Sequence, residues 1–211
     1  MQMIAIAATK GGTSKSTLAA SLLVEASRHV KRAALIDLDP QQSLATWHGM
    51  RSTPDTELVP TGAKMGSALD KVRARAEPPD IVIVDTPPGL MRFAEMAIEK
   101  ADLVLVPCRA SPLDVQAVDI MRELCETAGK PYVFVLTMVN LKREMMTAGA
   151  RDFLKDKGPV LDVVMTDRES YPKAMLGGRT GPEIDKAAKA EIAALWVAIR
   201  KQLAAKKRAS K

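Results

Sequence analysis

The fold is decided near the N-terminus by the stretch Met3-Ile4-Ala5-Ile6-Ala7-Ala8-Thr9-Lys10-Gly11-Gly12-Thr13-Ser14-Lys15-Ser16-Thr17. An apolar run typical of a buried strand leads into a glycine-rich turn and then into a segment with helical apolar spacing. Glycines let backbone N–H groups converge on phosphate oxygens, and the helix N-terminus adds a favourable dipole. Lys15 can reach terminal phosphates and the Ser16 hydroxyl can ligate Mg²⁺. We interpret this segment as a phosphate-binding loop.

The rest of the chain alternates between short apolar runs and amphipathic segments. Strands are predicted at residues 3–8, 33–36, 57–60, 81–84, 103–106, 132–138 and 160–164. Helices are predicted at residues 16–30, 42–50, 66–76, 93–99, 113–128, 142–155 and 182–205. Strands that are apolar throughout and separated by helices indicate a parallel sheet covered on both faces. The predicted fold is α/β: a single doubly wound, mostly parallel sheet with helices on both faces.

The composition is that of a globular chain with an aliphatic core. The 211 residues are 47% hydrophobic and 27% charged, which suits one α/β domain. Aromatic residues make up only 3%, so a base-stacking surface for single-stranded nucleic acid is poorly supplied. Cys108 and Cys125 form no C-x-x-C pair, and no zinc or iron–sulfur ligand set is present. The free thiols and the lack of a signal peptide or membrane span fit a cytoplasmic protein.

The net charge of +6 is concentrated at the C-terminal end. No acidic residue follows Glu191, and six cations lie beyond it from position 200 onward: Arg200, Lys201, Lys206, Lys207, Arg208 and Lys211. These cations can form a solvated helix end that complements the helix dipole, which charge alone favours. They can instead form an arm for nucleic acid or anionic lipid. We divide the chain into a nucleotide-binding domain, residues 1–204, and a basic tail, residues 205–211.

Three segments in order resemble the ParA/MinD ATPases. The loop lacks the ordinary G-x-x-x-x-G-K-S/T form, but its second lysine, Lys10, gives K-G-G-x-x-K-S, which resembles the deviant Walker A motif of that family. Residues 37–41 resemble its D-x-D-P-Q segment, and residues 81–89 resemble its Walker B strand with the D-x-P-P turn. Residues 166–180 are similar to its later arginine-containing loop and short helix. The resemblance spans residues 3 to about 204.

The resemblance implies an Mg²⁺-dependent ATP hydrolase that binds ATP and ADP. Lys15 would hold the β- and γ-phosphates, Ser16 would ligate Mg²⁺ directly, and Asp85 would hold the metal through water. Asp37 would lie near Mg²⁺, and Asp39 would position the attacking water. The remaining nucleotide contacts would come from Gly11, Gly12, Thr13, Ser14 and Thr17. The alternative for the carboxylates is strand-end solvation or capping of the helix that follows Gln41.

Lys10 has an implied role across a dimer. In the family, the signature lysine contacts the ATP of the partner in a nucleotide-sandwich homodimer and acts like an arginine finger. Dimerisation would then depend on the γ-phosphate. The alternative is that Lys10 serves the phosphates of its own chain. Ser14 stands where glycine is commoner, which costs free energy if that position needs a positive φ.

Two residues are candidates for the base site. Asn140 follows a predicted strand, and its amide can read the edge of adenine. It can equally be a turn residue before a helix. Arg168 can line the same pocket or form a structural ion pair.

The resemblance implies a partition or positioning function. Because the sequence shown begins at the first strand, without an N-terminal helix-turn-helix, we expect the short ParA class. Such proteins bind double-stranded DNA non-specifically as ATP dimers, and a ParB-like or centromere-binding adaptor stimulates hydrolysis and release. The cargo would be a plasmid, a chromosome or another large assembly, positioned on the nucleoid. The candidate DNA contacts are Lys173, Arg179, Arg200, Lys206, Lys207 and Arg208.

Two other functions are open. One is a MinD-like membrane switch, but after Leu203 only three alanines are apolar, so no membrane anchor is expected. The other is a metabolic phosphate-loop enzyme, such as an ATP-dependent amide- or ring-forming synthetase. The D-x-D-P-Q match and the lack of an extra domain argue against it.

Overall fold

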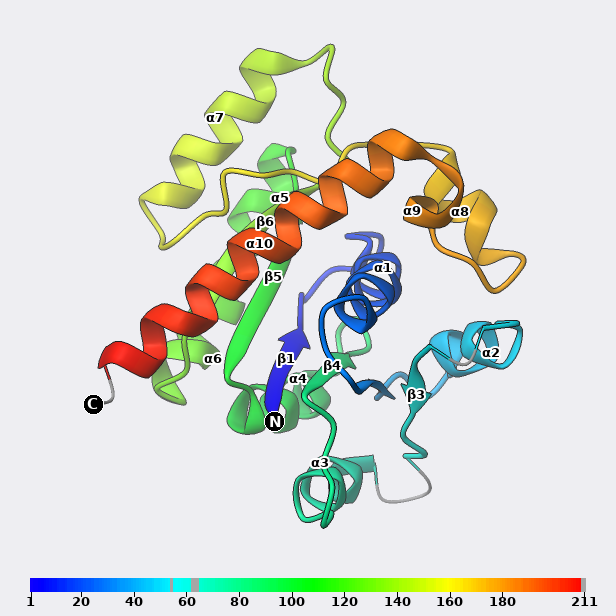
Figure 1. The fold of residues 1–211 in the computed structure, drawn as a ribbon. Helices are drawn as coiled ribbons and strands as arrows, with labels where there is room; N and C mark the ends of the chain where they lie inside the picture. The colour runs from blue at the N-terminus through cyan, green and yellow to red at the C-terminus, as the bar shows by residue number, and fades with distance from the viewer. Residues whose placement is uncertain (54, 62–64, 210–211) are drawn as a thin grey trace.

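A central parallel sheet organises the molecule (Figure 1). The computed structural model describes residues 1–53, 55–61 and 65–209, without the side chains of 65–66 and 206–209. The sheet has the order β3-β2-β4-β1-β5-β6, and every neighbouring pair is parallel. The strands are β1 (Gln2–Ile6), β2 (Ala33–Asp37), β3 (Glu57–Leu58), β4 (Ile81–Asp85), β5 (Leu103–Arg109) and β6 (Tyr132–Thr137). The predicted α/β fold is confirmed.

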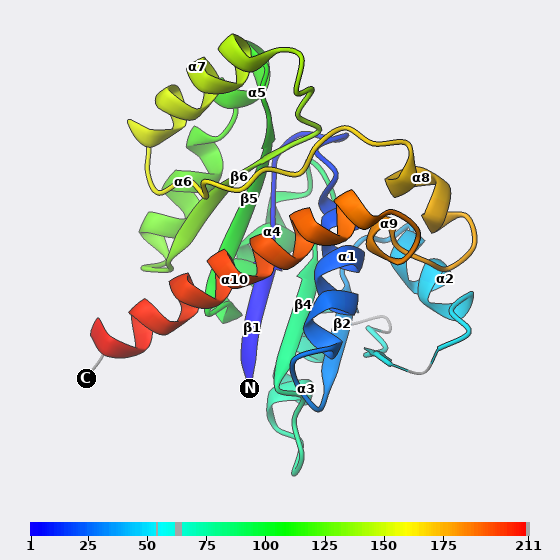
Figure 2. The same cartoon turned by 45° about the horizontal axis from the view of Figure 1, so that its top comes forward.

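Helices cover both faces of the sheet, as Figures 1 and 2 show. One face packs against α1 (Lys15–Ser27), α2 (Ser43–Gly49), α8 (Ser170–Met175) and α10 (Lys186–Ala209). The other packs against α3 (Met65–Arg73), α4 (Met91–Lys100), α5 (Pro112–Gln116), α6 (Asp119–Thr127) and α7 (Glu144–Lys155). Successive strand residues alternate between the two cores: Ile4 and Ile6 face α1, whereas Met3 and Ala5 face the opposite side. This is why the strands β1, β2 and β4 are apolar at every position except one end.

Two predicted helices are each divided in the structure. The segment 113–128 forms α5 and α6, with a turn at residues 117–118. The Thr9 hydroxyl donates to the Ala117 carbonyl at 3.2 Å, so the phosphate-binding loop uses the carbonyl at the break. The segment 182–205 forms α9 (Gly181–Ile184) and α10, separated by an extended Asp185. The Asp185 carboxylate accepts from the amides of Ala187 and Ala188, which caps α10.

The prediction of a strand at residues 160–164 is wrong. The segment pairs with β6 only at the isolated bridge between Phe134 and Val160, while a second bridge joins Val139 and Thr166. Between these bridges the chain bends away, and the Asp162 side chain is 96% exposed. An apolar run is therefore extended here without joining the sheet as a strand.

β5 continues three residues beyond its predicted end. Pro107 suggests a strand end because it cannot donate a ladder hydrogen bond. The Val104 amide donates to the Pro131 carbonyl beside β6. Because the amides of a strand point alternately to its two neighbours, the odd-numbered positions of β5 face β1. β1 pairs with β5 only up to Leu105 and then leaves the sheet as the loop. Position 107 thus needs no donor, and the strand reaches Arg109 at the same edge as the loop.

Within the described ranges, no helix combines the length and the apolarity needed to cross a membrane.

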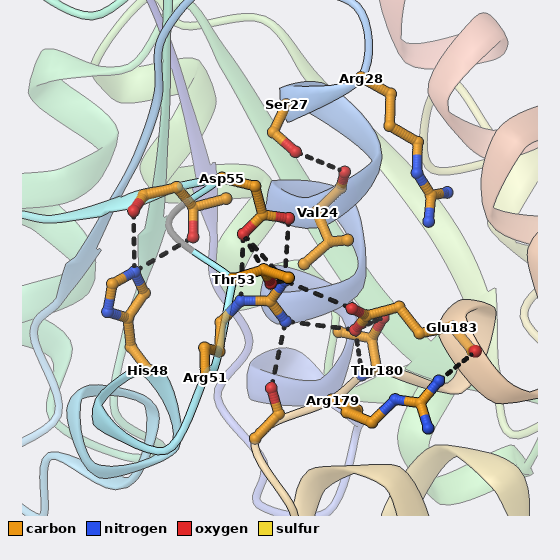
Figure 3. Close-up of polar contacts among 12 residues, drawn as sticks. Val24, Ser27, Arg28, His48, Arg51, Thr53, Asp55, Arg179, Thr180 and Glu183 are labelled. Atoms are coloured by element: carbon orange, nitrogen blue, oxygen red, sulfur yellow. Dashed lines mark hydrogen bonds and ion pairs between the residues drawn. The ribbon is translucent and has the colours of Figure 1, made fainter.

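A buried guanidinium joins the α2 end to the segment before α10 (Figure 3). The Arg51 side chain is 2% exposed and pairs with Asp55 at 2.9 Å and with Glu183 at 3.2 Å. It also donates to the Gly178 carbonyl at 3.1 Å. Burial alone would lower the pKa of Arg51, but hydrogen bonds with Glu183 and Asp55 outweigh it and raise the pKa. Gly178 has φ 68°, and a Cβ there would lie 2.5 Å from the Met50 carbonyl carbon, so only glycine fits.

Replacing Arg51 with methionine should destabilise the fold by about 3 kcal/mol, because it leaves Glu183 and Asp55 without their cation. Urea unfolding followed by circular dichroism measures the change. The control is Arg32→Met, since the Arg32–Glu77 pair is exposed on both sides and should contribute about 0–1 kcal/mol. Equal effects of the two substitutions would show that Arg51 does not hold these segments together.

Candidate functional site

The site lies at the edge of the sheet where the parallel strands end. β1 runs into the loop of residues 7–14, which leads into α1. β2 and β4 end side by side, with Asp37 and Asp85 as register partners, and Ile6 pairs with Asp85 on the other side. The sheet therefore places two carboxylates directly beside the loop.

The loop contains two residues with positive φ just before α1. Gly12 has φ 71°, and Ser14, the residue before α1, has φ 60° and ψ 28° in the left-handed region. Left-handed backbone costs roughly 1–2 kcal/mol in a residue with a side chain, so Ser14 carries strain that glycine would avoid. Both Gly11 and Gly12 are exposed, which leaves their amides open to a ligand.

Lys15 is buried at the start of α1. Its side chain extends back over the loop, and Nζ donates to the Lys10 carbonyl at 3.0 Å. Burial lowers the pKa of Lys15, and the charges of Asp85 and Asp39 partly oppose that effect. A cation held in this way inside the loop suits the terminal phosphates of a nucleotide.

Ser16 and Asp85, the two residues expected to hold Mg²⁺, are in direct contact. The Ser16 hydroxyl donates to Asp85 Oδ2 at 2.6 Å. Asp85 Oδ1 is buried and accepts no hydrogen bond within the described residues. A buried carboxylate oxygen without a partner, next to a hydroxyl and a phosphate-binding loop, fits a hard cation such as Mg²⁺. Bound Mg²⁺ would neutralise phosphate charge there, with Ser16 as ligand and Asp85 behind it.

Asp37 caps a helix, whereas Asp39 is partly open to solvent. Asp37 accepts from the amides of Leu44 and Ala45 at 3.0 Å, and from that of Asp39. It thus caps the N-terminus of α2, the alternative considered for this carboxylate, although it stays beside Asp85. Burial raises the pKa of Asp37, and the backbone hydrogen bonds oppose the rise. Asp39 Oδ1 accepts from the Gln41 amide, and the half-buried side chain lies where water can reach it.

Lys10 lies apart from Lys15 and is held by α5. Its Nζ donates to the Leu113 carbonyl at 2.6 Å and lies 3.4 Å from Asp114 Oδ1. Asp114 also accepts from Arg109 Nε at 2.9 Å and from the Ser111 hydroxyl at 2.6 Å. Burial tends to raise the pKa of Asp114, but the hydrogen bonds from Ser111 and Arg109 and the nearby cations outweigh it and lower the pKa.

Both base-site candidates contact other parts of the protein in this structure. Asn140 Oδ1 accepts from the Lys142 amide at 2.9 Å, which is the turn arrangement considered for it. Its side chain is nevertheless exposed and lines a cavity of about 330 Å³ with Met138 and Arg143. Arg168 donates to Glu191 at 2.6 Å, the structural ion pair that was its alternative. The bridge between Val139 and Thr166 brings the two segments together.

The candidate DNA contacts are spread over the end of the chain. Lys173, Arg179 and Arg200 are exposed. Arg179 donates to the Glu183 carbonyl, and Arg200 donates to the Gln2 side chain. The backbone of α10 continues through Ala209, into the predicted tail. The side chains of Lys206, Lys207 and Arg208 lie outside the described part.

Comparison with known proteins identifies the family. The model of the CobQ/CobB/MinD/ParA nucleotide-binding domain matches residues 4–180, which include the loop, both aspartate segments and the 166–180 segment. The chain belongs to this family. Membership in the CobQ/CobB/MinD/ParA family confirms the resemblance found in the motifs and makes the chain a nucleotide-binding domain.

Relatives of the chain include partition and positioning proteins. It is 25% identical over 179 residues to the protein ParA of Rhizobium radiobacter, covering 81% of each. It is 28% identical over 182 residues to the maintenance of carboxysome distribution protein A of Halothiobacillus neapolitanus, covering 83% of this chain and 84% of the relative. The fold also matches a Borrelia burgdorferi protein described as a putative plasmid partition protein and bound to AMPPNP. The TM-score is 0.79 at 18% identity, over 95% of this chain and 99% of the other.

Arg109 and Asp114 are charged residues beside the loop that the sequence motifs did not indicate. Arg109 ends β5, just as Asp37 and Asp85 end their strands, and Asp114 follows shortly after. The predicted end of that strand at residue 106 hid them, because proline is typical of a strand end. The signal in the sequence is that polar residues follow Pro107, which point to the site once the strand is extended past the proline.

We expect Asp85 to make the stability of the nucleotide-free chain depend on pH. Burial raises its pKa from 3.8 to about 7, despite the hydrogen bond from Ser16. Because the folded chain holds this proton more tightly than the unfolded chain, the contribution of Asp85 to stability is highest at low pH. This contribution to the free energy of unfolding decreases by about 1.4 kcal/mol per pH unit as the pH rises from about 4 to about 7.

Urea unfolding of the wild type and Asp85→Asn across pH 4–8 measures this contribution. The variant should lack the pH-dependent loss, so the difference between the two proteins should grow toward pH 7 and then level off. Parallel pH profiles would contradict the raised pKa.

Proposed function

We propose that the chain is a ParA-like partition ATPase that works as a nucleotide-dependent switch. It hydrolyses ATP with Mg²⁺, forms a homodimer when ATP is bound, and moves or positions a large cargo. One observation carries the proposal: the loop holds two lysines with separate places. The buried Lys15 lies against the loop, with Nζ on the Lys10 carbonyl, whereas the side chain of Lys10 lies against α5 and is 40% exposed.

The surface around Lys10 suits a second copy of the chain. Leu113, whose carbonyl holds Lys10, is 72% exposed. Met138 and Met146 are also exposed and line one cavity with Asp114, which lies 3.4 Å from Lys10. α5 and α7 enclose an open groove of about 300 Å³ with a mainly apolar lining. Apolar side chains gathered beside a nucleotide site favour a surface that is covered in one nucleotide state.

Lys10 would then act across the dimer. It must leave Leu113 and Asp114 to reach the phosphates of the facing copy, where its charge would help to neutralise the transferred γ-phosphate. Asp39, half-buried just beyond the end of β2, would position the attacking water. Because contact across the dimer needs the γ-phosphate, hydrolysis would separate the copies.

Double-stranded DNA is the proposed surface on which the dimer acts, in the cytoplasm at the nucleoid. The exposed cations Lys173, Arg179 and Arg200, with the tail cations, would contact phosphates without reading sequence. A ParB-like or centromere-binding adaptor would stimulate hydrolysis and release. The ParA of Rhizobium radiobacter and the carboxysome distribution protein, each matched over most of its length, support a positioning role.

Size-exclusion chromatography with light scattering tests the switch. We expect a monomer with ADP and a dimer with a non-hydrolysable ATP analogue and Mg²⁺. Lys10→Ala should bind the analogue but stay monomeric. Lys31→Ala, which removes an exposed lysine at the opposite edge of the sheet, should dimerise like the wild type. A wild type that is monomeric in both nucleotides would favour a metabolic phosphate-loop enzyme instead.

DNA binding of the ATP-bound dimer should depend steeply on salt. If all six cations from position 200 onward contact phosphates, the slope of log K against log salt is about −5 per subunit. A triple variant that combines Lys206→Ala, Lys207→Ala and Arg208→Ala should make the slope shallower by about 3 per subunit. Fluorescence anisotropy on two unrelated DNA sequences measures this, with Lys71→Ala on α3 as control. An unchanged slope would show that the tail cations do not contact DNA. Binding to anionic vesicles instead of DNA would favour a MinD-like switch.

A further inference from the structure

Arg109 lies beside the phosphate-binding loop, and most of its N–H groups make no hydrogen bond to the described residues. It is the last residue of β5, and its side chain is 43% exposed. Nε donates to Asp114 Oδ2 at 2.9 Å. Across the described ranges, neither of its two terminal nitrogens donates a hydrogen bond to the protein. One edge of the guanidinium is therefore fixed and the other is free.

The free edge is next to the loop. A Cβ placed on Gly12 would lie 3.9 Å from Arg109 Nη1, the nearest heavy atom found there. Gly12 is exposed and has φ 71°, so its amide and the guanidinium border the same open space. A planar fork of N–H donors beside loop amides matches the oxygens of a phosphate group.

The position of Lys15 indicates which phosphate this is. Lys15 reaches the terminal phosphates in such loops, and its Nζ lies 3.0 Å from the carbonyl oxygen of Lys10. The terminal phosphate should then lie along the Lys10–Gly12 side of the loop, which is the side that Arg109 borders.

Asp114 holds the guanidinium in place for that contact. Its side chain is 4% exposed and accepts from Arg109 Nε and the Ser111 hydroxyl, with Lys10 at 3.4 Å. One buried carboxylate therefore positions two exposed cations beside the loop. A guanidinium fixed through Nε loses less conformational freedom when its other nitrogens bind an anion.

We propose that Arg109 is a nucleotide-contacting residue whose terminal nitrogens bind the γ-phosphate of ATP and so distinguish ATP from ADP. The inference rests on the proposed nucleotide switch and adds a third cation, after Lys15 and Lys10. The phosphate belongs either to the nucleotide of the same chain or to that of a facing copy. The chemistry is the same in both cases, and the experiment separates them.

The test measures affinity for fluorescently labelled ADP and a labelled non-hydrolysable ATP analogue with Mg²⁺, at protein concentrations low enough to keep the chain monomeric. Light scattering at high concentration then measures dimerisation. For contact within one chain, Arg109→Gln should weaken binding of the ATP analogue about tenfold and of ADP less than about threefold, since only ATP loses a charged hydrogen bond. Arg109→Lys should recover part of the loss, because it restores charge without the fork.

Contact with a facing copy gives a different pattern. Arg109→Gln would then bind both nucleotides like the wild type as a monomer but require at least about tenfold more protein to dimerise with the ATP analogue. The control is Arg122→Gln on α6, whose partners Asp119 and Glu126 lie on the same helix. Thermal unfolding without nucleotide checks that each variant folds.

The outcomes separate this inference from the proposed function. If Arg109→Gln matches Arg122→Gln in both affinity and dimerisation while the wild type binds ATP, the role of Arg109 is overturned and the nucleotide switch stands. An equal loss of ADP and ATP binding would also overturn it, because the contact would not involve the γ-phosphate. A wild type that binds neither nucleotide would overturn both.

Discussion

The cost of burying the carboxylate of Asp85 shapes the nucleotide site. Asp85 ends a strand that is buried at every position, and its neighbours in register are Ile6 and Asp37. A buried charge is stable only with compensation from hydrogen bonds or opposite charge. Ser16 and Lys15 supply part of it, yet one oxygen has no hydrogen-bond partner among the residues described. The site is thus electrostatically incomplete in a way that a bound divalent cation would complete.

The same edge of the sheet contains a second charge system with the opposite balance. At Asp114, two cations and a hydroxyl share one carboxylate, so positive charge is in excess beside the loop. On the Asp85 side of the loop negative charge is incompletely matched, whereas on the Asp114 side two cations face one carboxylate. A Mg²⁺–nucleotide complex, with its cation on one side and phosphate anions on the other, matches this asymmetry.

Much of this arrangement could be predicted from residue spacing. Apolar runs separated by amphipathic segments indicate a two-faced parallel sheet, and parallel strands place Lys15, Ser16, Asp37 and Asp85 at one edge. What spacing could not show is how long-range contacts redirect local preference. Thr9 contacts the carbonyl at the break between α5 and α6, and the departure of β1 makes Pro107 acceptable within β5. Asn140 and Arg168 show the same limit, because each residue type suits a nucleotide contact and a structural contact equally well.

The order of the strands has a consequence for the newly made chain. β1, which leads into the loop, lies between β4 and β5, so residues 2–6 cannot be paired on both sides until residues 81–105 are available. β1 is thus enclosed only after both flanking strands, which follow it in the chain, have been made, and α10 packs over α1. Such distant pairing slows folding and leaves apolar strands exposed during synthesis. During translation the chain must therefore keep its N-terminal strand from aggregating until β4 and β5 have emerged.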